Sequence, residues 1–236
     1  MVNIWPIIDR VAGGRCPLCN QPGQRLCAPC TGELPHNHHP CPRCALPLPA
    51  DVPAGVCCAE CQARTPAFDR VIAPLVYETP VDELVAGFKY HQRLYLGPLL
   101  AGIVATAARR ETAGAELLLP VPMSAARFRE RGFNQAAELA RCLARGIGIP
   151  WAADRLHRTR EGGHQQALGR RSRRRNVRGA FAARGKLPAR VALIDDVVTT
   201  GATADAASRA LKAAGVEWVE VWTVARTPRD HRYNGR

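Results

Sequence analysis

VALIDDVVTTGAT, residues 191–203, is the stretch that decides the fold. The four apolar residues at 191–194 predict a strand that is covered on both faces. Asp195 and Asp196 follow at its carboxyl end, where open α/β sheets bind their ligands. A loop that carries hydroxyls and backbone N–H groups then leads into the start of a helix. The free N–H groups and the positive end of the helix dipole at such a start can bind a phosphate. The residues that would surround this phosphate are Thr199, Thr200, Gly201, Ala202 and Thr203.

The sequence on either side of this stretch alternates between strand and helix patterns. Strands are expected at 71–77, 117–121 and 216–224, with Pro74 placing the first at a sheet edge. Helices are expected to start at Pro80, and to span 97–110, 134–145 and 203–214, with Asn134 as a cap. This alternation predicts an α/β domain with a mainly parallel sheet over residues 66–236.

Residues 1–65 have a different composition, with four Cys-x-x-Cys pairs and few large apolar residues. Two such pairs complete a tetrahedral zinc site, so eight cysteines predict two structural zinc ions. Disulfides are the alternative, but they suit secreted chains. Cys57 could replace Cys58 as a ligand. An exposed loop is expected to contain His36, His38 and His39. The spacing leaves open which pairs share an ion. The expected ligands are Cys16, Cys19, Cys27, Cys30, Cys41, Cys44, Cys58 and Cys61.

Composition narrows the possible classes of protein. A hydrophobic fraction of 47% over 236 residues excludes a mainly disordered chain. No apolar run is long enough for a membrane span and no signal peptide is recognisable, so a cytoplasmic protein is expected. Most of the formal net charge of +13 lies in residues 66–236, which suits a phosphate-bearing partner.

The stretch 191–203 resembles the PRPP (5-phosphoribosyl 1-diphosphate) motif of type I phosphoribosyltransferases. Receiver domains also end a strand with paired Asp, but they lack the Thr-Gly-x-Thr loop. The resemblance implies that Asp195 and Asp196 accept hydrogen bonds from the ribose hydroxyls. It implies that Thr199–Thr203 hold the 5′-phosphate, and that Mg²⁺ accompanies PRPP.

Three further segments resemble the competence protein F (ComF) family: FKY at 88–90, PVPMSAARFRERGFNQAAELA at 120–140, and RTR to RRNVRGAF from 158 to 181. That family joins an N-terminal double zinc ribbon, here residues 1–65, to a type I phosphoribosyltransferase-like domain, here residues 66–236. The resemblance implies a role in the uptake of transforming DNA. The loop 120–124, with Val121–Pro122 as a candidate cis bond, and Arg131 would meet the diphosphate. The doubled Cys57–Cys58 departs from the family pattern.

The segment 155–178 contains nine arginines and one acid, and three interpretations of it stay open. In the first it is a catalytic loop that closes over PRPP, with Arg171 or Arg175 meeting the departing diphosphate. In the second it binds a nucleic-acid backbone, although no aromatic residue is interleaved. In the third it is a solvated basic loop.

Three functions therefore remain. The first is Mg²⁺-dependent phosphoribosyl transfer to an unknown acceptor; purine salvage is disfavoured because Thr199 stands where 6-oxopurine enzymes carry Asp. The second is a non-catalytic protein that handles single-stranded DNA and uses the fold to bind PRPP or a related ribose phosphate. The third is an adaptor that docks on a protein of the competence machinery through the zinc ribbon.

Overall fold

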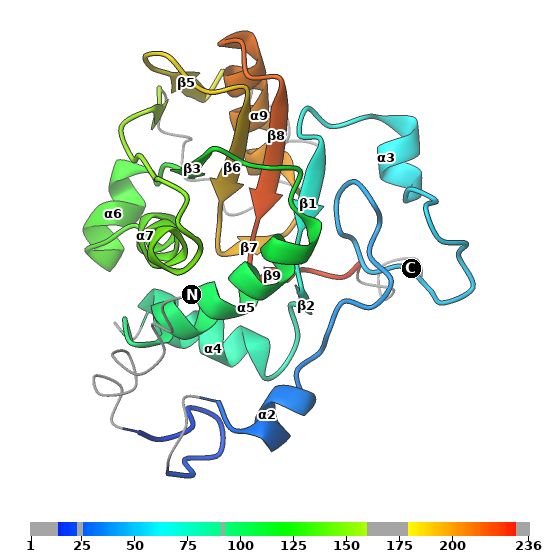
Figure 1. Ribbon diagram of the computed structural model, residues 1–236, viewed down its shortest axis with the longest axis vertical. Helices are drawn as coiled ribbons and strands as arrows, with labels where there is room; N and C mark the ends of the chain where they lie inside the picture. Colours follow the sequence, from blue (N-terminus) through cyan, green and yellow to red (C-terminus); the bar gives the residue numbers. More distant parts are fainter. Residues whose placement is uncertain (1–13, 23–25, 91–92, 160–178, 230–236) are drawn as a thin grey trace.

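A four-stranded parallel sheet forms the centre of the protein (Figure 1). The computed structural model describes residues 14–22, 26–90, 93–159 and 179–229. Every neighbouring pair in the sheet is parallel, which confirms the predicted architecture. In spatial order the strands are β1 (Arg70–Ile72), β8 (Trp218–Trp222), β6 (Arg190–Ile194) and β3 (Leu117–Pro120).

After three of these strands the chain continues, a few residues later, into a strand of a second, smaller parallel sheet. Its order is β2 (Leu75–Val76), β9 (Ala225–Arg226) and β7 (Val197–Val198), which repeats the order of β1, β8 and β6. The single strand expected at 71–77 is therefore two strands, because Pro74 between them has no N–H group to donate. The strand expected at 216–224 starts later, since the Val216 N–H still bonds the Leu211 carbonyl at the end of a helix.

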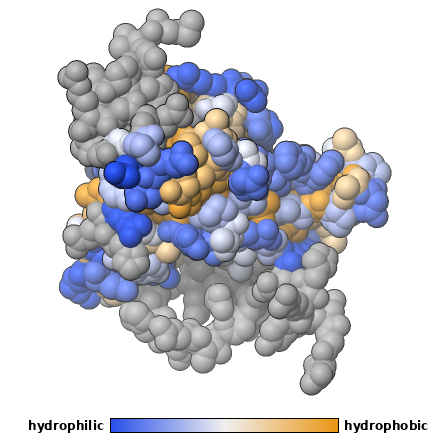
Figure 2. Space-filling view, turned by 90° about the horizontal axis from the view of Figure 1, so that it is seen from below, coloured by the Kyte–Doolittle hydropathy of each residue, from blue (hydrophilic) through white to orange (hydrophobic). Residues whose placement is uncertain are grey.

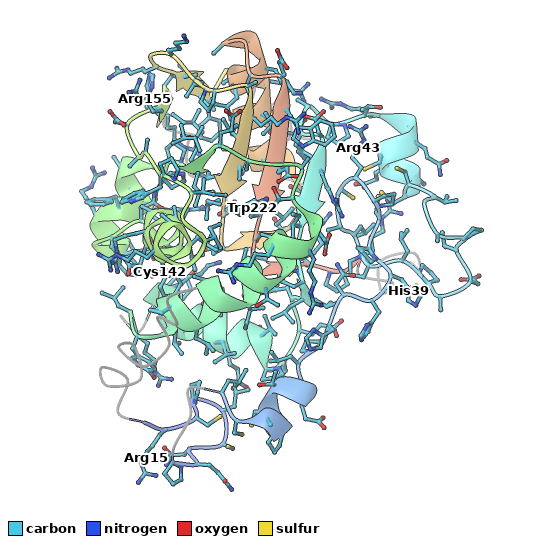
Figure 3. The ribbon with its side chains drawn as sticks, in the orientation of Figure 1. Arg15, His39, Arg43, Cys142, Arg155 and Trp222 are labelled. Carbon is cyan, nitrogen blue, oxygen red and sulfur yellow. The ribbon has the colours of Figure 1, made fainter. Side chains whose placement is uncertain are left out.

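Helices cover both faces of the sheet. On one side lie α4 (Val81–Tyr90), α5 (Leu96–Glu111) and α7 (Gln135–Ile147), and on the other lies α9 (Ala202–Ala213). The side chains of β6 alternate between the two cores, with Ala192 and Ile194 facing the first and Val191 and Leu193 the second. Trp222, fully buried, lies near the centre of the molecule (Figure 3).

Two sequence predictions about helix ends and peptide bonds need correction. Helix α7 continues past Arg145 and Gly146, because Gly148 supplies the left-handed residue, with φ of 78°, that ends it. The cis peptide bond in the described residues is Thr79–Pro80 and not Val121–Pro122. The chain before Pro122 stays extended, since the Val121 N–H continues the ladder to β6. The predicted Asn134 cap is confirmed: its side chain accepts from the Ala136 N–H at 3.0 Å.

The sequence did not predict a small antiparallel hairpin of β4 (Leu156–Arg158) and β5 (Phe181–Ala183). It also missed α6 (Ala125–Arg131), which follows β3. Arg171 and Arg175 fall between β4 and β5, outside the described residues.

The two cysteine-rich units lie against different parts of the domain (Figure 1). The first, with α2 (Ala28–Gly32), lies below α4, and its Leu18 and Leu26 pack against the α4–α5–α7 core. The second, with α3 (Ala59–Ala63), lies beside β1, and its cysteines belong to the core on the α9 side. His36, His38 and His39 are exposed, as predicted.

The surface carries both polar and apolar residues. Seen from below it is largely hydrophilic, with hydrophobic residues gathered near the middle of that face (Figure 2). Among the described helices, none combines the length and the apolar character that a bilayer crossing requires.

Candidate functional site

Asp195 and Asp196 lie in the gap between β6 and β7, at the carboxyl end of the main sheet. Their side chains are turned back onto the chain: Asp195 accepts from the Asp196 N–H at 2.9 Å, and Asp196 accepts from the Val197 N–H at 2.6 Å. The Thr223 hydroxyl donates to the Asp196 carbonyl at 2.8 Å and fixes the same turn. The acids therefore occupy a rigid break in the strand.

One cation contacts the acid pair, and two more interact with it through their charge. Lys89 Nζ at the end of α4 lies 3.0 Å from Asp196 Oδ1, and both side chains are largely buried. Burial and the charge of Asp196 raise the pKa of Asp195 to about 7, while Lys89 and Arg127 act in the opposite direction. Burial and the charge of Arg127 lower the pKa of Arg158, and Asp195 opposes this shift. Helix α4 thus supplies the cation that contacts the acids, and Arg127 of α6 and Arg158 of β4 interact with Asp195 through their charge.

The loop 199–203 leads from β7 into α9 and has the geometry of an anion site. Gly201 is the residue before α9 and has φ of 73°, a left-handed value that a β-carbon would strain. Within the described chain, the N–H groups of Thr199, Thr200 and Gly201 donate to no other group. The Ala202 N–H has only a long contact of 3.4 Å, to the Thr200 hydroxyl. These amides and the positive end of α9 can bind a phosphate.

A hollow in the surface lies between this loop and the second cysteine unit. Phe68, Thr200 and Gly201 line it, together with Arg64 and Arg209. The acid pair does not line it. This hollow is therefore not one that the acid pair and the loop form together.

The loop after β3 is held against the site by side-chain contacts. The Ser124 hydroxyl accepts from the Arg127 N–H at the start of α6. The Asn134 side chain donates to the Val121 carbonyl at 3.1 Å. Arg131 does not contact the acids in the described residues: it donates to the Tyr90 hydroxyl at 2.9 Å and stacks 4.7 Å above the Tyr90 ring. Its role as a diphosphate ligand stays a prediction.

The eight cysteines form two clusters whose members follow one another in sequence. Within each cluster the sulfur atoms all lie within 4.8 Å of one another. Cys58, not Cys57, belongs to the second cluster. The first cluster is Cys16, Cys19, Cys27 and Cys30, and the second is Cys41, Cys44, Cys58 and Cys61.

The sulfur geometry fits zinc. No disulfide forms, and neighbouring sulfurs lie 3.5 Å apart (Cys19–Cys27) and 3.6 Å apart (Cys44–Cys58). Tetrahedral Zn–S bonds of about 2.3 Å place sulfurs about 3.8 Å apart. The hydrogen bond between Cys41 and Cys44 lowers the pKa of Cys41 to about 4 and raises the pKa of Cys44. The Cys58 N–H also donates to Cys41 Sγ at 3.3 Å. Both clusters could bind structural zinc.

Lys89, Arg127 and Arg226 are site residues that the sequence analysis did not single out. Lys89 lies in the FKY segment, whose family resemblance was the available signal, and Arg127 follows the predicted loop 120–124. Arg226 is buried beneath the loop 199–203, where it donates to the Val198 carbonyl at 3.0 Å. Nothing in the local sequence indicates a buried arginine at that position.

Comparison with known proteins gives the family. A DNA utilization protein YhgH of Salmonella typhimurium is 32% identical over 227 residues, which cover 91% of this chain and 97% of the relative. The Competence protein F of Haemophilus influenzae is 32% identical over 178 residues, covering 72% of this chain and 78% of the relative.

Among solved structures, a glutamine phosphoribosylpyrophosphate amidotransferase from B. subtilis aligns with a TM-score of 0.39 and 20% identity, over 58% of this chain and 30% of that chain. No family model matches the chain. On the extent and identity of the sequence matches, the chain belongs to the competence protein F (ComF) family.

Proposed function

We propose that this protein binds PRPP, or a related ribose phosphate, together with Mg²⁺ at residues 195–203. The observation that carries the proposal is the acid pair in a strand break, next to a loop whose amides have no partner in the described chain. Asp195 and Asp196 would accept hydrogen bonds from the ribose hydroxyls. The amides of Thr199–Gly201 would hold the 5′-phosphate.

The same site supports transfer of the phosphoribosyl group to an acceptor. In this reaction the bond from ribose C1 to the diphosphate oxygen breaks, a bond from C1 to the acceptor forms, and diphosphate leaves. Mg²⁺, when bound, would neutralise charge on the diphosphate. Arg127 and Arg158 add positive charge beside the acids, and such charge favours the departure of an anion.

Calorimetric titration with PRPP and Mg²⁺, followed by analysis of released diphosphate, tests this proposal. The double variant Asp195→Asn, Asp196→Asn keeps the side-chain shapes and removes both charges. We expect its PRPP affinity to fall at least tenfold, because hydrogen bonds to charged groups contribute about 1.5–3 kcal/mol each. Asp51→Asn, at an exposed acid, is the control. Unchanged affinity in a folded double variant would contradict the proposal.

We propose further that residues 1–65 and 66–236 are two domains and that the first binds two structural zinc ions. The cysteine clusters support the zinc assignment. A zinc ribbon of this size could also dock on a protein of the competence machinery. Copurification of such a protein with the wild-type chain, lost on deletion of the first cluster, would support docking.

A second candidate function is the handling of single-stranded DNA, and one surface favours it. Tyr90 and Phe128 are 57% and 51% exposed. Arg131 covers one face of the Tyr90 ring, and Arg127 and Arg129 flank Phe128 in α6. Aromatic rings beside arginines bind single strands by stacking on bases and by contacting phosphates. The names of the relatives, DNA utilization protein and competence protein, agree with this candidate.

Anisotropy of a labelled oligothymidine at several salt concentrations tests the second candidate. If DNA binds at α4 and α6, Tyr90→Ser should weaken binding by about 1–3 kcal/mol. Trp151→Ser, which removes an exposed aromatic residue outside these helices, should not. Equal losses in both variants, or no binding by the wild type, would exclude this surface.

A further inference from the structure

Arg226 is a buried charge that contacts both the second cysteine cluster and the loop 199–203. It lies in β9, the middle strand of the small sheet, and is 4% exposed. Its Nε donates to the Cys44 carbonyl at 3.0 Å. Its Nη1 donates to the carbonyls of Val198, at 3.0 Å, and Thr199. A buried guanidinium needs hydrogen-bond acceptors, so these contacts constrain both the backbone at Cys44 and the start of the loop 199–203.

The contacts with Val198 and Thr199 set the direction of the amides that would bind phosphate. In a trans peptide unit the C=O and N–H groups point in opposite directions. The Val198 carbonyl shares its peptide unit with the Thr199 N–H, and the Thr199 carbonyl shares its unit with the Thr200 N–H. Because Arg226 holds both carbonyls, it turns the Thr199 and Thr200 N–H groups away from itself.

The contact with Cys44 connects this arrangement to the metal site. A zinc ion with four thiolates carries a net charge of −2, from four thiolates and one divalent cation, and Arg226 is the buried cation beside it. Loss of the metal would remove the anchor that fixes the Cys44 backbone. The Cys44 carbonyl, which accepts from Arg226 Nε, would then be free to move.

Three more contacts attach the segment around the second cluster to β1 and α9. The Val71 N–H of β1 donates to the Arg43 carbonyl. The Arg43 side chain, labelled in Figure 3, donates to the Phe68 carbonyl at 3.3 Å. The chain after the last cysteine is fixed to α9, where Asp205 accepts from the Ala67 N–H at 2.8 Å. In the described chain, no hydrogen bond joins the first cluster to residues 195–203.

We infer that Arg226 is a positioning residue through which zinc in the second cluster orders the phosphate-binding loop, so that zinc and phosphate ligand each strengthen the binding of the other. The first cluster takes no part in this coupling. The inference rests on the proposed function for its ligand, a phosphate monoester such as the 5′-phosphate of PRPP. By linkage, the effect of zinc on phosphate affinity equals the effect of phosphate on zinc affinity.

Amide hydrogen exchange and calorimetry on Arg226→Lys test the positioning role. Lysine keeps the charge but lacks the fork that reaches several carbonyls. We expect the variant to retain two zinc ions per chain and to bind PRPP with Mg²⁺ about tenfold more weakly. The Thr227 and Asp205 amides, which donate to the Val198 and Gly201 carbonyls at the two ends of the loop, should exchange faster. Exchange in α7 should not change. Unaltered exchange at these two amides, with zinc retained, would overturn the role of Arg226.

A chelator competition on the wild-type chain tests the coupling without any substitution in the sheet. Saturating PRPP with Mg²⁺ should raise about tenfold the chelator concentration that removes one zinc ion and leave the other unchanged. In Cys30→Ser, which disrupts the first cluster, the protected zinc should remain. Equal behaviour of both ions, or protection of the first cluster, would overturn the inference. If PRPP does not bind at all, the proposed function fails, whereas amide exchange in Arg226→Lys still decides the positioning role.

Discussion

The replacement of Asp195 by Asn should stabilise the protein in a way that depends on pH. The pKa of Asp195 is raised to about 7 from a reference value of 3.8, by burial and by the charge of Asp196. Between about pH 4 and pH 7 the folded chain keeps a proton here that the unfolded chain has lost, so the free energy of unfolding falls as pH rises. Each pKa unit corresponds to about 1.4 kcal/mol.

The raised pKa of Asp195 gives the wild-type protein a free-energy penalty on folding of about 4 kcal/mol at pH 8 and about 2 kcal/mol at pH 5. Asn removes the charge and can still accept the hydrogen bond from the Asp196 N–H. The difference in unfolding free energy, Asp195→Asn minus wild type, should therefore be about 2–3 kcal/mol larger at pH 8 than at pH 5.

Urea denaturation of the zinc-loaded proteins, followed by circular dichroism at both pH values, gives this difference. Any pH effect on the zinc sites is common to the two proteins and cancels. Asp51→Asn, an exposed control, should show no such dependence. If the difference for Asp195→Asn is the same at both pH values, the carboxyl is not held in the environment described above.

Three further outcomes are expected. Elemental analysis should find two zinc ions per chain in the wild type and in Cys57→Ser but about one in Cys58→Ser, and two ions in both variants would refute the ligand assignment. Asn134→Ala should lower the free energy of unfolding by about 1 kcal/mol through loss of the α7 cap, whereas an unchanged urea midpoint would show that the cap is unimportant. Lys89→Met should raise the pKa of Asp195 further, because Lys89 lowers it; a carboxyl titration followed by ¹³C NMR that moves downward would contradict the arrangement of charges.

The sequence was sufficient to predict the fold and the site where a local pattern strongly favours one structure. Four apolar residues before two acids predicted a buried strand, and the strand, the acids and Gly201 are where the pattern placed them. The tandem cysteine pairs likewise predicted two clusters. The structure added that neighbouring pairs form each cluster, which spacing alone cannot decide.

What the sequence could not predict depends on contacts between distant segments. The ion pair of Lys89 with Asp196 joins residues more than a hundred positions apart, and no periodicity indicates it. The short hairpin β4–β5, with three residues in each strand, carries too little pattern to be recognised. Arg226 lies beyond the strand expected at 216–224, and its burial depends on the packing of the second cysteine unit and of β7 against β9.

A crystal structure of the zinc-loaded protein with PRPP and Mg²⁺ is the most direct test of the central claim. The proposal predicts the 5′-phosphate on the N–H groups of Thr199–Gly201 and the ribose hydroxyls on Asp195 and Asp196. A phosphate bound in the hollow beside Phe68 and away from the acids, or ribose hydroxyls that contact neither acid, would contradict it.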